Sequence, residues 1–258
     1  MKRQLYPVMI LLTSPYYVRN LLYVFTSYMA SDLLCHGPMS ASLRLLLPPG
    51  IPATETETER NLLSDLEATS GGEERAQALW HLVLFYQNDA KRSDLATALL
   101  HQMIHESHDH ERKATAYLAL GQIAQLNENW NTALAHYAKG LSFSPTEHDT
   151  SYLLRNNAGY CLNALGLYAA GEKYCRRAIE IDAKRHNAYK NLGVSLYGQG
   201  DHRSAAWCWV EAIKVNPADP DAAVLLRELL SKHPSLNSDY PWIQQALKKF
   251  RKKNSQPI

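Results

Sequence analysis

Two equal spacings constrain this chain more than any other feature of its sequence. The interval from Gly159 to Gly193 is the same as the interval from Ala178 to Ala212. A period of about 34 residues is typical of one helix–turn–helix unit, which cannot bury its apolar face alone. The repetition therefore predicts a stack of helix pairs, an architecture that produces surface rather than catalytic chemistry.

The best copy of the repeat spans residues 186–219. Its two helices each carry one face of apolar or small residues, namely Tyr189, Leu192, Gly193, Leu196, Ala205, Trp209 and Ala212. Gly193 and Ala205 are small where we expect the paired helices to cross. Pro217 ends the second helix, because it lacks an N–H and clashes with the preceding turn.

Two earlier copies, residues 152–185 and 114–147, follow the same pattern. The interval from Gly121 to Gly159 is longer than one period by four residues, which we expect to be absorbed in a turn near residues 146–149. Three positions depart from the best copy: Arg155 replaces an aromatic residue, Gly140 an alanine and Ala183 a proline. These departures weaken single copies without changing the predicted fold.

The recurring small residues, the aromatic residue four positions after the second of them and the closing proline together resemble the tetratricopeptide repeat (TPR) family. The resemblance covers residues 114–219. It implies an all-α, right-handed helical solenoid of antiparallel helix pairs, closed by capping helices at its C-terminal end. Residues 57–113 are helical in pattern and are predicted to form a degenerate repeat, and residues 220–258 to form capping helices with a basic tail.

Residues 1–56 do not share the repeat character and end in a proline-rich linker. A basic start and a short apolar run give two alternatives for this segment: a signal or targeting piece, or an extension upstream of Met39. The composition otherwise favours the cytoplasm, and export or membrane attachment would depend on residues 1–34 acting as a signal. Neither apolar stretch is long enough for a spanning helix.

Composition and motifs argue against an enzyme. The chain is 46% apolar and 20% charged with a net charge of +2, which gives no reason to expect nucleic acid as a partner. Four cysteines without a C-x-x-C pair argue against a zinc knuckle or a redox site, and we expect Cys175 to be a buried thiol. No phosphate loop or nucleophile elbow is present, and we predict no cofactor.

A histidine-rich turn provides the one enzyme-class alternative, an accessory subunit with a metal site. His101 and His105 are one helical turn apart, which puts two imidazoles on one helix face, and His108 and His110 follow. No glutamate between the first pair could act as a base. Solvated turn chemistry explains the cluster equally well, so we assign no metal ligand.

The TPR resemblance implies that the first helices of the repeats line a concave groove that binds a protein or peptide segment. The groove-facing positions it implies are Gln122, Gln125, Asn156, Asn157, Tyr160, Asn163, Asn187, Lys190, Asn191 and Tyr197. Amides at one repeat spacing, such as Asn157 and Asn191, can bind the backbone of an extended peptide. The predicted function is thus an adaptor or assembly factor, and the alternative is a chaperone-like secretion helper that holds an unfolded client.

A clamp for a C-terminal carboxylate is not expected. The TPR subclass with that clamp uses lysine, arginine and asparagine at set positions, whereas this chain has Leu118, Gln122, Asn187 and Asn191 at four of them. Only Asn157 matches. The partner's identity and the oligomeric state do not follow from the sequence.

Overall fold

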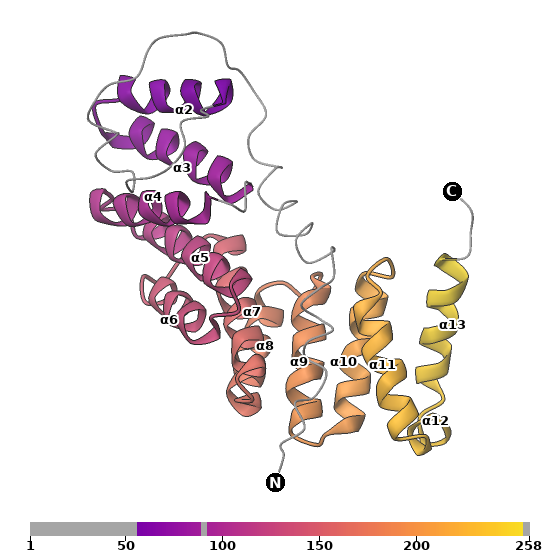
Figure 1. The fold of residues 1–258 in the computed structure, drawn as a ribbon. Helices are drawn as coiled ribbons and strands as arrows, with labels where there is room; N and C mark the ends of the chain where they lie inside the picture. Colours follow the sequence, from indigo (N-terminus) through magenta and orange to yellow (C-terminus); the bar gives the residue numbers. More distant parts are fainter. Residues whose placement is uncertain (1–55, 89–91, 255–258) are drawn as a thin grey trace. The chain divides into compact units, whose positions relative to one another are not determined.

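A computed structural model describes residues 56–88 and 92–254 of the chain. In this part every regular element is a helix, which confirms the predicted all-α fold (Figure 1). The segment 1–55, with its predicted targeting or extension role, lies outside the described residues. Contacts divide the described residues into two compact units, which we call the N-terminal unit (residues 56–150) and the C-terminal unit (residues 151–254).

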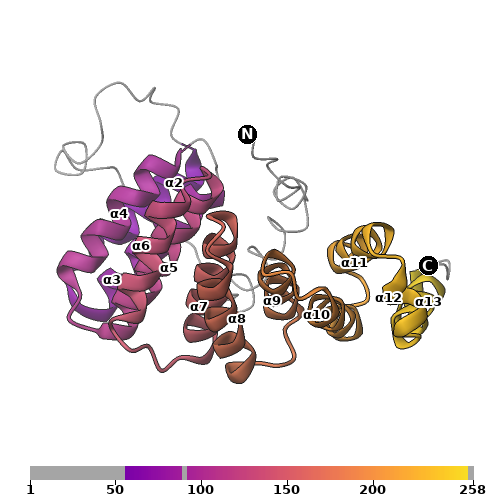
Figure 2. The same ribbon diagram turned by 90° about the horizontal axis from the view of Figure 1, so that it is seen from below.

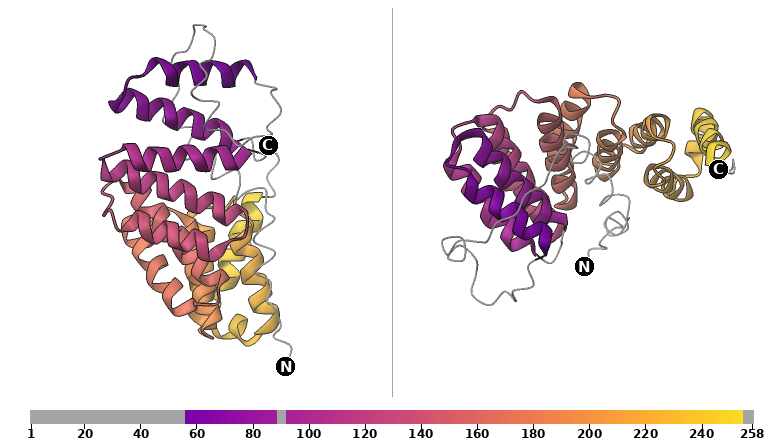
Figure 3. Two further views of the ribbon diagram at one scale, coloured as in Figure 1. Left: turned by 60° about the vertical axis from the view of Figure 1, so that its left-hand side comes forward. Right: turned by 90° about the horizontal axis from the view of Figure 1, so that it is seen from above.

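The N-terminal unit stacks its helices as successive antiparallel layers (Figure 3). They are α2 (Glu57–Ala68), α3 (Gly72–Asn88), α4 (Ser93–Glu106), α5 (His110–Leu126) and α6 (Trp130–Leu141). Leu66, Leu82 and Leu100 are fully buried in the core between these layers. A buried carboxylate fastens α2 to its neighbours, because Glu59 accepts hydrogen bonds from the Tyr86 hydroxyl at 2.7 Å and from Arg92 at 3.0 Å.

The C-terminal unit has the same helix-pair organisation. It contains all but the first residues of α7 (His148–Ala164), then α8 (Tyr168–Ile181), α9 (His186–Gly198), α10 (His202–Val215), α11 (Asp221–Lys232), α12 (Ser235–Asp239) and α13 (Trp242–Asn254). Figures 1 and 2 show α9 and α10 side by side, followed by α11. The predicted basic tail begins in α13, and its side chains from position 249 on lie outside the description.

One internal rule relates the three TPR copies. The glycine of each first helix faces the same position of the second helix: Gly121 faces Tyr137, Gly159 faces Cys175 and Gly193 faces Trp209. A Cβ added at any of these glycines would overlap that partner's side chain. The group nearest to a Cβ at Gly193 is the Trp209 ring, so this glycine makes room for an indole.

The four additional residues between the first two copies are absorbed largely by a longer helix. The stretch from the start of the helix to its glycine runs from His148 to Gly159 in α7 and from His186 to Gly193 in α9, so it is one turn longer in α7. The addition is therefore mainly helical rather than only a longer loop. The Glu111 carboxylate fixes the connection that precedes it, accepting hydrogen bonds from the backbone N–H groups of Thr146 at 2.8 Å and Glu147 at 3.2 Å.

None of the helices in the described part combines the length and the apolar character that crossing a bilayer requires.

Candidate functional site

The ten predicted groove residues all lie on first helices of the repeats. Gln122 and Gln125 belong to α5 in the N-terminal unit, and the other eight belong to α7 and α9 in the C-terminal unit. Eight of the ten are buried, while Asn187 and Tyr197 are half-buried. The burial raises the question of which polar atoms are already bonded within the chain.

An asparagine network joins α7 to α9, and we define it as Asn156, Asn157, Asn163, Asn191 and Ser195. Asn191 Nδ2 donates to Asn156 Oδ1 at 3.0 Å, and Asn156 Nδ2 donates to Asn157 Oδ1 at 3.0 Å. Asn163 Nδ2 donates to the Asn191 carbonyl at 2.8 Å, and the Ser195 hydroxyl donates to Asn163 Oδ1 at 2.7 Å. These amides therefore fix the register of the two helices.

The network leaves one donor and one acceptor at its ends. The side chains of Asn156 and Asn163 are hydrogen-bonded through both the oxygen and the nitrogen. By contrast, no hydrogen bond among the described residues engages the Asn157 Nδ2 or the Asn191 Oδ1. An extended peptide backbone presents the complementary pair, a carbonyl and an N–H. Asn187, on the same helix as Asn191, also has no hydrogen-bonded side-chain partner in the described part of the chain.

Lys190, the one cation among the predicted groove residues, is bonded to two carboxylates. Its Nζ lies 3.0 Å from Asp219 Oδ2 and 2.9 Å from Asp221 Oδ2, so it ties α9 to the start of α11. Burial alone would raise the pKa of Asp219, but the contact with His186 and the charge of Lys190 hold that pKa well below its usual range. Nothing in the sequence indicated this pairing, because the two partners belong to the segment after the next helix.

The remaining predicted residues pack against core aromatics. The Tyr137 hydroxyl donates to Gln125 Oε1 at 2.9 Å in the N-terminal unit. In the C-terminal unit the Tyr197 ring lies 6.0 Å from the Trp209 ring and 5.4 Å from that of His202. Trp209 is buried in the core, whereas Trp207, two residues before it on α10, is exposed.

Sequence reasoning missed Ser195, although a signal existed. Ser195 follows Asn191 by one helical turn, which places both on one helix face. Its hydroxyl also donates to the Asn191 carbonyl at 3.1 Å. A short polar residue one turn after a predicted groove amide could have indicated a network.

The thiols are suited to packing rather than chemistry. Cys161, Cys175 and Cys208 are free and buried, which confirms the prediction for Cys175. Burial raises the pKa of each to about 12. A thiol with such a pKa stays protonated near neutral pH and is a poor nucleophile or metal ligand.

The histidine-rich turn does not assemble into a ligand set. His101 and His105 lie on α4, His108 in the following turn and His110 at the start of α5. Within the described part of the chain, no group of three or more histidine, cysteine or carboxylate side chains is arranged to hold a metal ion. The metal-site alternative therefore gains no geometric support.

Comparisons with known proteins agree with the repeat pattern. No family model matches the chain. Human tetratricopeptide repeat protein 7B is 30% identical over 100 residues, which is 39% of this chain and 11% of that protein. Human tetratricopeptide repeat protein 7A is 26% identical over 111 residues, 42% of this chain and 12% of the relative. The matched stretch is thus a small part of the length of these relatives.

A solved structure supports the architecture over a longer stretch. The chain resembles a double mutant of MamA from strain RS-1 with a TM-score of 0.57 and 12% identity, covering 72% of this chain and 99% of that one. This likeness concerns the fold. Helix pairs, repeat spacing and similarity define a helical solenoid of the tetratricopeptide type. The chain is similar in sequence to tetratricopeptide-repeat proteins over part of its length and has the fold of their helical solenoids.

Proposed function

We propose that this protein is a non-enzymatic interaction module that binds an extended segment of a protein partner along α7 and α9. The observation that carries the proposal is the pair of unused polar groups at the ends of the asparagine network, a donor on Asn157 and an acceptor on Asn191. Their spacing of one repeat matches the period at which the first helices recur. A peptide backbone can satisfy both groups whatever its side chains.

The network also supports preorganised binding. Amides that are already held by hydrogen bonds lose little side-chain entropy when a ligand arrives. The buried Cys175 has a raised pKa and stays protonated near neutral pH, which makes it a poor nucleophile. The bonded state of Lys190 leaves no unneutralised cation at that position, which favours backbone recognition over recognition of a ligand carboxylate.

The test replaces residues that face a ligand without removing the bonds between α7 and α9. Asn191 is a poor choice because its side chain donates to Asn156, so its replacement by alanine would remove a bond between α9 and α7. We therefore choose the double variant Asn157→Ala with Asn187→Ala. The exposed Asn131→Ala in α6 is the matched control.

Partner recovery from the native host should fall about tenfold for the double variant and stay unchanged for Asn131→Ala, because hydrogen bonds lost at a desolvated interface cost about 1–3 kcal/mol. Melting temperatures of the three proteins should agree within a few degrees. Undiminished recovery by a folded double variant would contradict the proposed site.

A further inference from the structure

The connection between α6 and α7 carries three hydroxyl groups, on Ser142, Ser144 and Thr146. The Ser142 hydroxyl donates to the Lys139 carbonyl at 2.7 Å, and the Thr146 hydroxyl donates to Glu111 Oε2 at 3.3 Å. The Ser144 side chain is exposed, and its hydroxyl forms no hydrogen bond within the described part of the chain. Of these three hydroxyls it is therefore the one that is available to a group from outside.

The backbone at Ser144 is strained. Its φ is +53°, in the left-handed region that a serine seldom adopts. Ser144 also precedes Pro145, and a residue before a proline favours an extended conformation. An enzyme that binds this segment in extended form would thus relieve strain at Ser144, in exchange for the hydrogen bond from its N–H to the Leu141 carbonyl at 3.0 Å.

Two lysines lie over the ring of the preceding residue, Phe143. Lys113 Nζ, from α5, is 5.9 Å from the ring centroid, and Lys139 Nζ, from α6, is 5.4 Å from it. The Tyr117 ring stacks on Phe143 at 5.8 Å. Among the described residues, neither ammonium group pairs with a carboxylate. Two positive charges without an acidic partner are thus held at the residue before the available hydroxyl.

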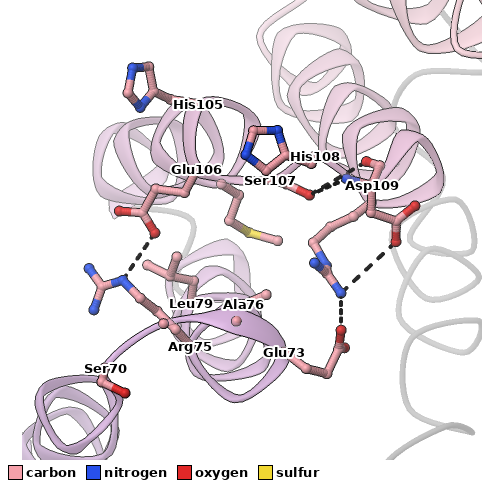
Figure 4. A pocket seen from close by; sticks show the side chains of 14 residues that line it. Ser70, Glu73, Arg75, Ala76, Leu79, His105, Glu106, Ser107, His108 and Asp109 are labelled. Carbon is pink, nitrogen blue, oxygen red and sulfur yellow. Dashed lines mark hydrogen bonds and ion pairs between the residues drawn. The ribbon is translucent and has the colours of Figure 1, made fainter.

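The arginines nearby in the same unit are different, because carboxylates neutralise them. They line a depression between the ends of α3, α4 and α5, where Arg75 pairs with Glu106, and Arg112 pairs with Glu73 and lies 4.0 Å from Asp109 (Figure 4). Three carboxylates accompany two arginines there, so charge selects no anion at that place. The two lysines over the phenylalanine ring keep their charge for an anion.

The carboxylates of the connection are held by other donors. Glu111 accepts from two backbone N–H groups, and Glu147 accepts from the Thr150 hydroxyl at 3.0 Å. A diffusible anion would meet the repulsion of both carboxylates as well as the attraction of the lysines. An anion attached covalently to Ser144 would instead be kept beside the lysines at a high effective concentration. This arrangement favours a modified serine over a site for a free anion.

We propose that Ser144 is a phosphorylation site of a proline-directed protein kinase, and that Lys113 and Lys139 hold the phosphate. Kinases of this class require a proline directly after the target hydroxyl. In the described part of the chain, Ser144 is the one serine or threonine that a proline follows. The site does not depend on the function proposed for α7 and α9.

The reaction joins the γ-phosphoryl group of ATP to the serine. Ser144 Oγ forms a bond to the γ-phosphorus, the bond from that phosphorus to the bridging oxygen of the β-phosphate breaks, and ADP leaves. The hydroxyl proton passes to the catalytic aspartate of the kinase. The product carries a charge of about −1.5 to −2 and can accept charge-assisted hydrogen bonds from both lysines, which would fasten α5 and α6 to their connection.

The first test incubates the full chain with ATP and a purified kinase of the mitogen-activated class, and maps the product by fragmentation mass spectrometry. We expect phosphorylation of Ser144, its loss in Ser144→Ala and a rate about tenfold lower or less in Pro145→Ala, because the kinase pocket selects the proline. The matched control is Ser142→Ala, which removes a hydroxyl of the same connection and should be phosphorylated at Ser144 as fast as the parent chain.

The second test asks whether the lysines hold the phosphate, with phosphorus NMR as the readout. The second pKa of the phosphoserine should lie about one pH unit below that of the same group in a peptide of residues 138–150, because nearby positive charges favour the dianion. Lys113→Gln with Lys139→Gln should remove most of this difference. Lys214→Gln, which breaks an exposed ion pair in α10, should leave it unchanged.

Each part of the proposal has a result that overturns it. Absence of phosphate on Ser144 of the folded chain would exclude the site, whether or not the peptide is modified. An equal rate for Pro145→Ala would exclude a proline-directed kinase. A phosphoserine pKa equal to that of the peptide, or one that the double lysine variant leaves unchanged while melting like the parent chain, would show that the lysines do not hold the phosphate.

Discussion

The copies 152–185 and 186–219 solve the same helix crossing in different ways. In the later copy Gly193 makes room for the Trp209 ring, whose Nε1 donates to the Lys190 carbonyl at 3.1 Å. In the earlier copy the partner is Cys175, and a second glycine, Gly171, allows the two helices to approach closely. The repeat therefore requires a close crossing, while the group that fills it can be a large ring or a thiol.

The two copies also differ at the start of their second helices. Asp201 caps α10 by accepting from the Ser204 N–H at 3.0 Å, whereas the equivalent Leu167 provides no side-chain cap for α8 and is 53% exposed. The earlier copy compensates through the asparagine network, which ties α7 to α9. The earlier copy thus lacks the side-chain cap of its second helix, and hydrogen bonds to the next copy hold its first helix instead.

The strongest effect should come from removing the aromatic residue that fills the later crossing. Trp209→Ala should reduce the free energy of unfolding by about 3–5 kcal/mol, because a fully packed ring is replaced by a cavity. Cys175→Ala at the equivalent position should cost on the order of 1 kcal/mol. Urea denaturation of both variants measures the difference, and similar losses would show that the crossings are filled equivalently.

A second prediction adds a methyl group at the earlier crossing. Gly159→Ala should destabilise the chain by about 1–3 kcal/mol, because the new Cβ would stand 2.6 Å from Cys175 Sγ. Combining it with Cys175→Ala should recover part of the loss, whereas combining it with Cys208→Ala, also a buried thiol, should not. Equal recovery in both combinations, measured by thermal melting, would contradict a direct contact at this crossing.

A smaller change is expected from giving the earlier copy the cap that it lacks. Leu167→Asp should stabilise the chain by about 0.5–1 kcal/mol, because an aspartate side chain can accept from a backbone N–H in the first turn of α8 as Asp201 does in α10. Leu167→Ala is the control for the loss of the exposed side chain. If both variants melt at the same temperature, the cap explains none of the difference between the copies.

The smallest effect should be on the pH dependence of stability, and it concerns His202, the first residue of α10. Burial and the charge of His233, whose ring lies 3.8 Å away, lower the pKa of His202, while Asp201 acts in the opposite direction. A histidine with a lowered folded-state pKa contributes stability above its ordinary value of 6.5 that is lost as the pH falls. His202→Tyr, which introduces the residue found at the equivalent position 168, should reduce the drop in melting temperature between about pH 7.5 and 5.5. If the drop in melting temperature is the same in the variant, groups other than His202 cause it.

Periodicity made the helix pairs and the core predictable. The equal spacing of small residues identifies a repeat, and the position of Trp209 within it specifies a buried face. The resemblance to the TPR family implies that all predicted groove residues lie on first helices, where the structure has them. It could not tell whether a polar side chain on that face is already bonded, because the partners of Asn163 and Lys190 lie in later helices and loops of the chain.

The sequence also did not predict the depression that is lined by the ends of α3, α4 and α5. Arg75 and Arg112 lie on different helices, α3 and α5, and neither belongs to a sequence motif. The sequence drew attention to the nearby histidines instead, since two imidazoles at helical spacing suggest a metal. Only the approach of three helix ends brings both arginines to the lining of one depression.

Site-specific photo-crosslinking is the sharpest test of binding along α7 and α9. A benzophenone side chain at position 187 should capture a partner in the native host, and the capture should decrease when Asn157 is also replaced by alanine. The same group at position 214, exposed on α10, should not capture that partner. Capture of the same species from both positions, or capture at position 187 that ignores Asn157→Ala, would contradict the account.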